Sequence, residues 1–100
     1  MNNYLVSISP KAVRDLREIS EYISTELESP IAAKKLILEI RDVILSLENF
    51  PERGSVRKIG QYAHKGYRQL FVKNYTIVYR VNHDKKQVII VTICYTPSLF

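Results

Sequence analysis

Two stretches of the chain carry apolar residues at three- and four-residue intervals, the spacing of one face of an α-helix. The first stretch begins at Ser9-Pro10 and the second at Ser29-Pro30. A serine followed by proline favours a helix start, because the hydroxyl accepts a hydrogen bond from the first turn and proline has no N–H that needs a partner there. The pattern predicts helices over about 10–27 and 30–48, joined so tightly that they form an antiparallel hairpin.

In the second half of the chain the apolar spacing becomes alternating, which is typical of β-strands. Including a short β-rich segment near the start, strands are expected at 4–8, 67–73, 75–81 and 87–95. The last strand is apolar in both alternating sets, so we expect it inside the sheet. The segment 53–62 fits either a short strand or a basic loop. The predicted fold is α+β in two layers, a helical hairpin packed on a twisted antiparallel sheet.

Length and composition place this fold in one domain over residues 1–100, with 46% apolar and 25% charged residues as in ordinary globular proteins. Cys94 is the only cysteine and cannot form an internal disulfide, and the start has no signal-peptide pattern. We therefore expect a cytoplasmic protein. The apolar runs are far shorter than the roughly 20 residues that cross a bilayer, so no membrane association is expected.

Charge divides the chain into two unlike halves. Residues 1–50 carry six basic and eight acidic side chains, whereas residues 51–100 carry nine basic and two acidic ones, so the net charges are −2 and +7. Five of the seven tyrosines also lie in the second half. This pattern fits a surface for nucleic acid or for an acidic partner, and it fits equally a sheet with tyrosines packed on its strands and lysines that keep the protein soluble.

Few residues suggest metal or cofactor chemistry. His64, His83 and Cys94 match no zinc-ligand spacing, and the three glycines form no phosphate-binding motif, so neither a metal nor a cofactor is expected. The remaining candidates are cations and tyrosines, which can hold phosphates and stack on bases. RNA cleavage without a metal would also need a proton acceptor and a proton donor beside the scissile phosphate.

Several segments, in order, resemble the RelE/ParE superfamily of toxins. In the helical half these are 12–19 (AVRDLREI) with 21–23 (EYI), 32–33 (AA) and 47–54 (LENFPERG), and in the sheet 66–81 (GYRQLFVKNYTIVYRV). The resemblance covers nearly the whole chain. It implies a toxin of a bacterial type II toxin–antitoxin pair, which folds as a helical hairpin against a twisted antiparallel sheet and is neutralised by a cognate antitoxin.

The resemblance offers two activities. RelE-like members cleave mRNA on the ribosome, and ParE-like members trap DNA gyrase without performing hydrolysis. Arg68 matches a basic position of the RelE-like site, but Thr76 stands where that branch has an arginine, and the end of the last strand lacks the arginines of many relatives. The long hairpin looks more like the ParE branch. The leading hypothesis is therefore a gyrase poison, with no catalytic residues of its own.

Two alternatives remain. A ribosome-dependent mRNA endonuclease would use Arg68, Lys73, Arg80 and Tyr95 to bind phosphate and transfer protons. A degenerate toxin would retain only antitoxin binding. In every case the resemblance implies a toxin–antitoxin hetero-oligomer. From the positive charge of the second half we predict that an apolar antitoxin helix lies in the groove beside the hairpin and that its acidic side chains meet a cationic surface. That surface is predicted to consist of Lys58, Lys65, Arg68, Lys73 and Arg80.

Overall fold

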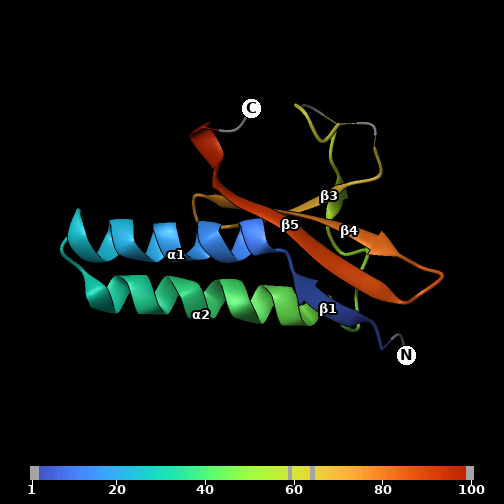
Figure 1. Cartoon of the computed structure of the whole chain (residues 1–100), viewed down its shortest axis with the longest axis horizontal. Coiled ribbons are helices and arrows are strands. Elements are labelled where there is room, and N and C mark those ends of the chain that lie inside the picture. The colour runs from blue at the N-terminus through green and yellow to red at the C-terminus, as the bar shows by residue number, and fades with distance from the viewer. Residues whose placement is uncertain (1–2, 59, 64, 99–100) are drawn as a thin grey trace.

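The computed structural model describes residues 3–58, 60–63 and 65–98. Two helices lie side by side against one face of a twisted sheet (Figure 1). The elements in chain order are β1 (Leu5–Ile8), α1 (Pro10–Thr25), α2 (Pro30–Ser46), β2 (Ser55–Val56), β3 (Arg68–Val72), β4 (Tyr75–Asn82), β5 (Gln87–Tyr95) and the 3-10 turn η1 (Thr96–Ser98). Within the described residues, no helix is long and apolar enough to span a membrane.

Both helices begin where the serine–proline pairs predict. The Ser9 hydroxyl accepts a hydrogen bond from the Ala12 N–H at 3.1 Å, and the Ser29 hydroxyl accepts one from the Ala32 N–H at 3.3 Å. Each helix ends two residues before the predicted end. After α1 the chain turns back through Glu28, whose φ is +49°, and this left-handed residue cannot continue a right-handed helix.

The sheet has the order β1-β5-β4-β3-β2, and β3, β4 and β5 form the predicted antiparallel meander with β5 in the interior. One correction applies to the expected antiparallel sheet. β1 pairs with β5 in parallel, so the sheet is mixed. No tight turn joins these two strands, because both helices and three strands separate them in the chain, and such a connection permits parallel pairing. The segment 53–62, for which the sequence allowed a short strand or a loop, contributes the two-residue edge strand β2.

The core lies between the helices and the inner face of the sheet. Completely buried there are Ile40 of α2, Leu47 just after it, Ile77 and Tyr79 of β4, and Ile90 of β5. The opposite face of the sheet is also covered in part, since the buried Thr76 hydroxyl hydrogen-bonds the Thr96 hydroxyl of η1 at 2.8 Å.

Asp15 fixes α1 on the sheet. Its carboxylate accepts hydrogen bonds from the Thr92 hydroxyl at 2.6 Å and from the Ile93 N–H at 3.0 Å, and Lys11 lies 3.2 Å away. These contacts fall where the β4–β5 register shifts by one residue, a bulge that leaves polar backbone groups in need of partners. One end of α1 is thereby attached to the middle of β5, and the other end projects past the sheet (Figure 1).

Candidate partner-binding cleft

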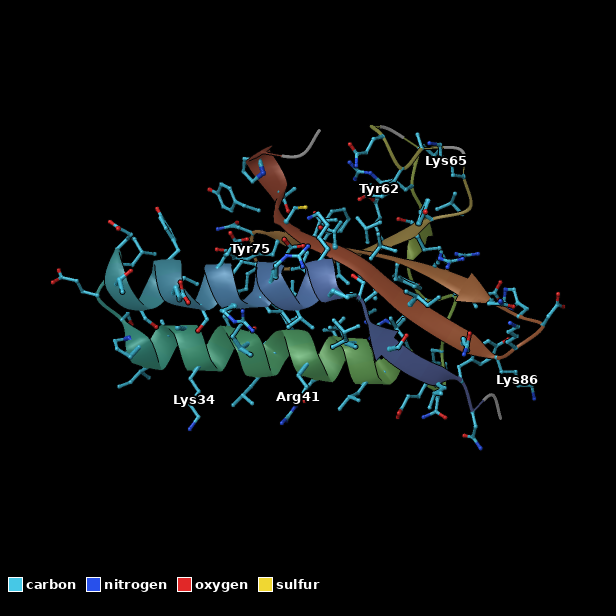
Figure 2. All side chains as sticks on the ribbon, in the orientation of Figure 1. Lys34, Arg41, Tyr62, Lys65, Tyr75 and Lys86 are labelled. Carbon is cyan, nitrogen blue, oxygen red and sulfur yellow. The ribbon has the colours of Figure 1, made fainter. Side chains whose placement is uncertain are left out.

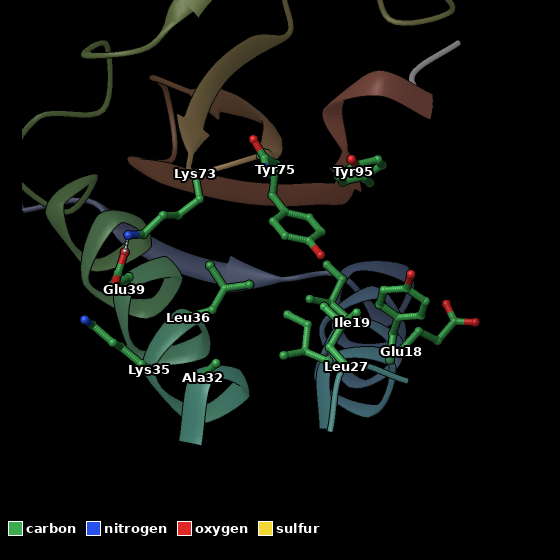
Figure 3. A pocket seen from close by; sticks show the side chains of 13 residues that line it. Glu18, Ile19, Leu27, Ala32, Lys35, Leu36, Glu39, Lys73, Tyr75 and Tyr95 are labelled. Carbon is green, nitrogen blue, oxygen red and sulfur yellow. Dashed lines mark ion pairs between the residues drawn. The ribbon is translucent and has the colours of Figure 1, made fainter. Parts of the chain in front are cut away.

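An open cleft of about 740 Å³ lies where the hairpin projects beyond the sheet (Figure 3). Its walls are the second half of α1, the first half of α2, the β3–β4 turn and the end of β5. The hairpin projects because Asp15, near the start of α1, is bonded to Thr92 and Ile93 of β5, so the rest of the helix extends past the sheet. The apolar stripe at the end of the hairpin therefore has no strand to cover it.

The surface of the cleft is mainly apolar. Ile23 and Leu36 form its floor, and each is 8% exposed. Tyr22 and Leu27 stand at its mouth, with 54% and 58% of their surfaces in contact with solvent. An open apolar surface on helices that face each other is typical of a site that binds a segment of another protein.

Two tyrosines form the wall opposite the helices. The rings of Tyr75 and Tyr95 meet edge to face with centroids 5.7 Å apart. Tyr75 points from β4 towards the helices, into the cleft (Figure 3). Burial raises the pKa of Tyr75 above 10.0, and the neighbouring hydroxyls of Tyr95 and Tyr22 add to this effect. Tyr75 is therefore neutral at physiological pH and offers a hydrogen-bond donor beside apolar surface.

Charged side chains stand at the rim. The Lys73 ammonium lies 3.9 Å from the Glu39 carboxylate, and Lys35 and Glu18 also border the cleft. Lys73 occupies the first position of the two-residue turn between β3 and β4, with φ at +54°. Glycine or asparagine is the usual residue in this conformation, so a lysine here carries some strain while its ammonium borders an apolar cleft.

The structure places the predicted cations at several separate positions. Lys73 and Tyr95 border the cleft. Arg68 lies at the other end of β3, where its guanidinium donates to the Gly54 carbonyl at 2.7 Å and approaches the Glu52 carboxylate at 3.6 Å. Arg80 is exposed on the opposite face of the sheet, because it follows the inward-facing Tyr79.

Lys58 and Lys65 are exposed and line neither the cleft nor its rim. Arg57, which contributes to the positive charge of the second half, is only 3% exposed. The excess charge seen in the sequence is thus spread over both faces and the edges of the sheet.

The segment 47–54 in the sequence resemblance has a structural role. The buried Tyr79 hydroxyl donates to the Pro51 carbonyl at 2.8 Å and accepts from the Gly54 N–H at 2.9 Å, which ties the end of the hairpin to the sheet. A Cβ at Gly54 would lie 2.5 Å from the Gln69 carbonyl oxygen, so only glycine fits. Thr76, at the position of a RelE-like arginine, is completely buried, where a guanidinium would be costly.

Among the described residues, no group of three histidine, cysteine or acidic side chains could hold a metal ion. His83 is about half exposed and its Nδ1 lies 2.9 Å from the Tyr4 hydroxyl, while Cys94 is partly buried beside Thr92. His64 lies outside the described residues.

Sequence reasoning missed the cleft walls. Ile19, Ile23 and Leu36 follow the periodic stripe of a helix, and that stripe predicts a covered core. No local signal marks the uncovered part of this stripe, because its exposure depends on where the hairpin lies against the sheet.

Two helices packed on a five-stranded mixed sheet match the RelE/ParE fold, which is of the α+β class. The sequence model of one family, described as the ParE toxin of the type II toxin–antitoxin system parDE, matches residues 6–96. The chain belongs to this family of type II toxins. No match was found among curated protein sequences.

Solved structures share the fold at low sequence identity. A chain of the chromosomal ParDE toxin–antitoxin system from P. aeruginosa superposes with a TM-score of 0.76 and 22% identity, over 93% of this chain and 96% of that one. The toxin–antitoxin complex RelBE2 from Mycobacterium tuberculosis gives 0.66 and 19%, over 93% and 98%. A mutant of the E. coli toxin RelE in the free state gives 0.62 and 13%, over 91% and 81%.

Proposed function

We propose that this toxin arrests growth in the bacterial cytoplasm by trapping DNA gyrase on cleaved DNA, without catalysis of its own, and that a cognate antitoxin holds it inactive. The observation that supports a toxin without catalysis is that the side chains required for RNA cleavage lie far apart. Metal-free cleavage needs a proton acceptor, a proton donor and cations within hydrogen-bonding reach of one phosphate.

Arg68, Lys73, Arg80 and Tyr95 do not meet this requirement. Arg68 and Lys73 are separated by five residues of extended strand, about 16 Å. Arg68 is held by the turn that precedes β2, and Arg80 faces away from the cleft. A binding role needs no such convergence, so the arrangement favours a toxin that acts by binding.

The cleft is the proposed site of the antitoxin. Its apolar floor suits the apolar face of a helix, and Lys35 and Lys73 at the rim suit carboxylates beside that face. Most of the affinity is expected from apolar anchors, because exposed ion pairs contribute only about 0–1 kcal/mol each. The cations should act mainly on the rate of association.

A supercoiling assay tests the proposed activity. Purified toxin, relaxed plasmid, ATP and gyrase are combined, and we expect less supercoiled and more cleaved plasmid. Toxin preincubated with antitoxin should have no effect, and ribosome-bound mRNA should stay intact. Codon-specific cuts in mRNA with unaffected gyrase would contradict the proposal in favour of the endonuclease. Antitoxin binding with neither effect would indicate a degenerate toxin.

The rim charge is tested by Lys73→Glu, which should slow antitoxin association several-fold at low salt and change dissociation less. Lys86→Glu is a matched control, because Lys86 is also exposed in a β-turn with positive φ, at +51°, but at the far end of the sheet (Figure 2). The difference between the two variants should shrink as salt rises, since the Debye length is about 8 Å at physiological ionic strength. Equal association rates for both variants at low salt would refute the role of Lys73.

A further inference from the structure

The outward face of α2 carries an apolar stripe that the described chain leaves partly exposed. Ile31, Leu38 and Leu45 are 85%, 39% and 46% exposed, and they follow one another at intervals of seven residues. Seven residues are nearly two helical turns, so the three side chains lie in one line along the helix, about 21 Å from first to last. The buried residues of α2, such as Leu36 and Ile40, lie on the other side of the helix.

The partner helix of the hairpin provides an internal comparison. The exposed side of α1 is mainly polar, with Arg14, Arg17 and Glu21 in contact with solvent. Single exposed apolar residues are common on protein surfaces, but a repeat of seven is the pattern by which one helix packs along another. The stripe on α2 is therefore a docking surface for a helix.

Charge identifies the kind of helix that fits. Lys34 and Arg41 alternate with the apolar residues along one flank of the stripe, and both point away from the sheet (Figure 2). Arg41 lies 3.2 Å from the exposed Asp42 carboxylate, so the cations Lys34, Lys35 and Arg41 outnumber the one acid on this face. In an antiparallel pair of two copies, centred on Leu38, Lys34 of one copy would face Arg41 of the other on one flank. Lys35 would face Asp42 on the other flank, so repulsion and attraction would offset each other. A helix with carboxylates along the flank of Lys34 and Arg41 would instead be attracted. The surface fits an acidic amphipathic helix rather than a second copy.

The stripe is continuous with the cleft. Ala32 and Lys35 line the cleft, and they lie on the same helix turns as Ile31 and Lys34. A chain that leaves the cleft over α2 therefore reaches the stripe without crossing intervening surface. We infer that a second helix of the antitoxin docks on the outward face of α2, with an apolar residue every seven positions and carboxylates facing Lys34 and Arg41. This inference rests on the proposed role of the cleft.

The test uses the complete toxin–antitoxin complex and measures association and dissociation rates. Ile31→Asp should weaken antitoxin binding tenfold or more, and Lys34→Glu with Arg41→Glu should slow association several-fold at low salt. Ile31 is so exposed that its substitution should leave the fold intact, which circular dichroism verifies. Arg17→Glu, a charge reversal on the outward side of α1, is the matched control and should leave both rates unchanged.

A substitution in the cleft separates this inference from the proposal on which it rests. Leu27→Asp should abolish binding, whereas Leu5→Asp on β1 should not, although Leu5 is 68% exposed and Leu27 is 58% exposed. Loss of binding by Leu27→Asp, with no change for the α2 variants, would overturn the α2 inference alone. If no variant changed antitoxin binding, the proposal that the cleft binds the antitoxin would be overturned as well. Self-association of the free toxin that Ile31→Asp abolishes would identify a second copy as the occupant and overturn the inference.

Discussion

Removal of a single oxygen atom, in Tyr79→Phe, should destabilise the toxin severely. The Tyr79 hydroxyl is buried and joins two backbone groups of the turn after α2, the Pro51 carbonyl and the Gly54 N–H. Phenylalanine would keep the ring packed in the core and delete only these two hydrogen bonds. Pro51 and Gly54 are themselves buried, so water cannot readily replace the hydroxyl.

The expected loss follows from the two orphaned groups. A buried donor or acceptor left without a partner costs about 1–3 kcal/mol. Glu52 and Arg53 are exposed, so the turn can relax, and we place the total near the lower end, at about 2–4 kcal/mol. For a domain of this size each kcal/mol lowers Tm by roughly 4–8 °C, so Tm should fall by about 8–32 °C.

Urea and thermal unfolding, followed by circular dichroism, measure the change in the free energy of unfolding. Tyr22→Phe is the matched control, because Tyr22 borders the open cleft and is 54% exposed, and its effect should stay within about 0.5 kcal/mol. If Tyr79→Phe proved as stable as Tyr22→Phe, the turn would not depend on this hydroxyl, and the structural account of the segment 47–54 would be wrong.

Three further outcomes are expected. Burial raises the pKa of Tyr79 and Tyr75 above 10.0, so the folded state holds these protons more tightly than the unfolded state does. The free energy of unfolding should therefore fall as pH rises above about 10 through the raised pKa values. Tyr79→Phe should weaken this pH dependence, which urea unfolding at alkaline pH measures. Asp15→Ala should cost about 2 kcal/mol in urea unfolding, because the Ile93 N–H loses its acceptor; wild-type stability would contradict this. Gly54→Ala should lower Tm, because its Cβ would meet a carbonyl of β3 at 2.5 Å, and an unchanged Tm would refute the clash.

Local sequence determined the elements of this protein. Ser9 and Ser29 mark both helix starts because a capping hydroxyl acts within three residues, and the strands follow from alternation that each segment carries in itself. The order of motifs over residues 12–81 was sufficient to identify the toxin superfamily, which the match to the ParE family over 6–96 confirms.

Tertiary structure decided how these elements meet. The parallel pairing of β1 with β5 joins segments about eighty residues apart, and no local pattern specifies the direction of such a pair. The cleft exists because α1 is anchored at Asp15 and projects beyond the sheet, a consequence of packing between elements rather than of either helix alone. The sequence groups Lys73 and Arg80 by charge, but the pleat and the twist of the sheet separate them. Strand direction and sheet face determine which side chains share a surface.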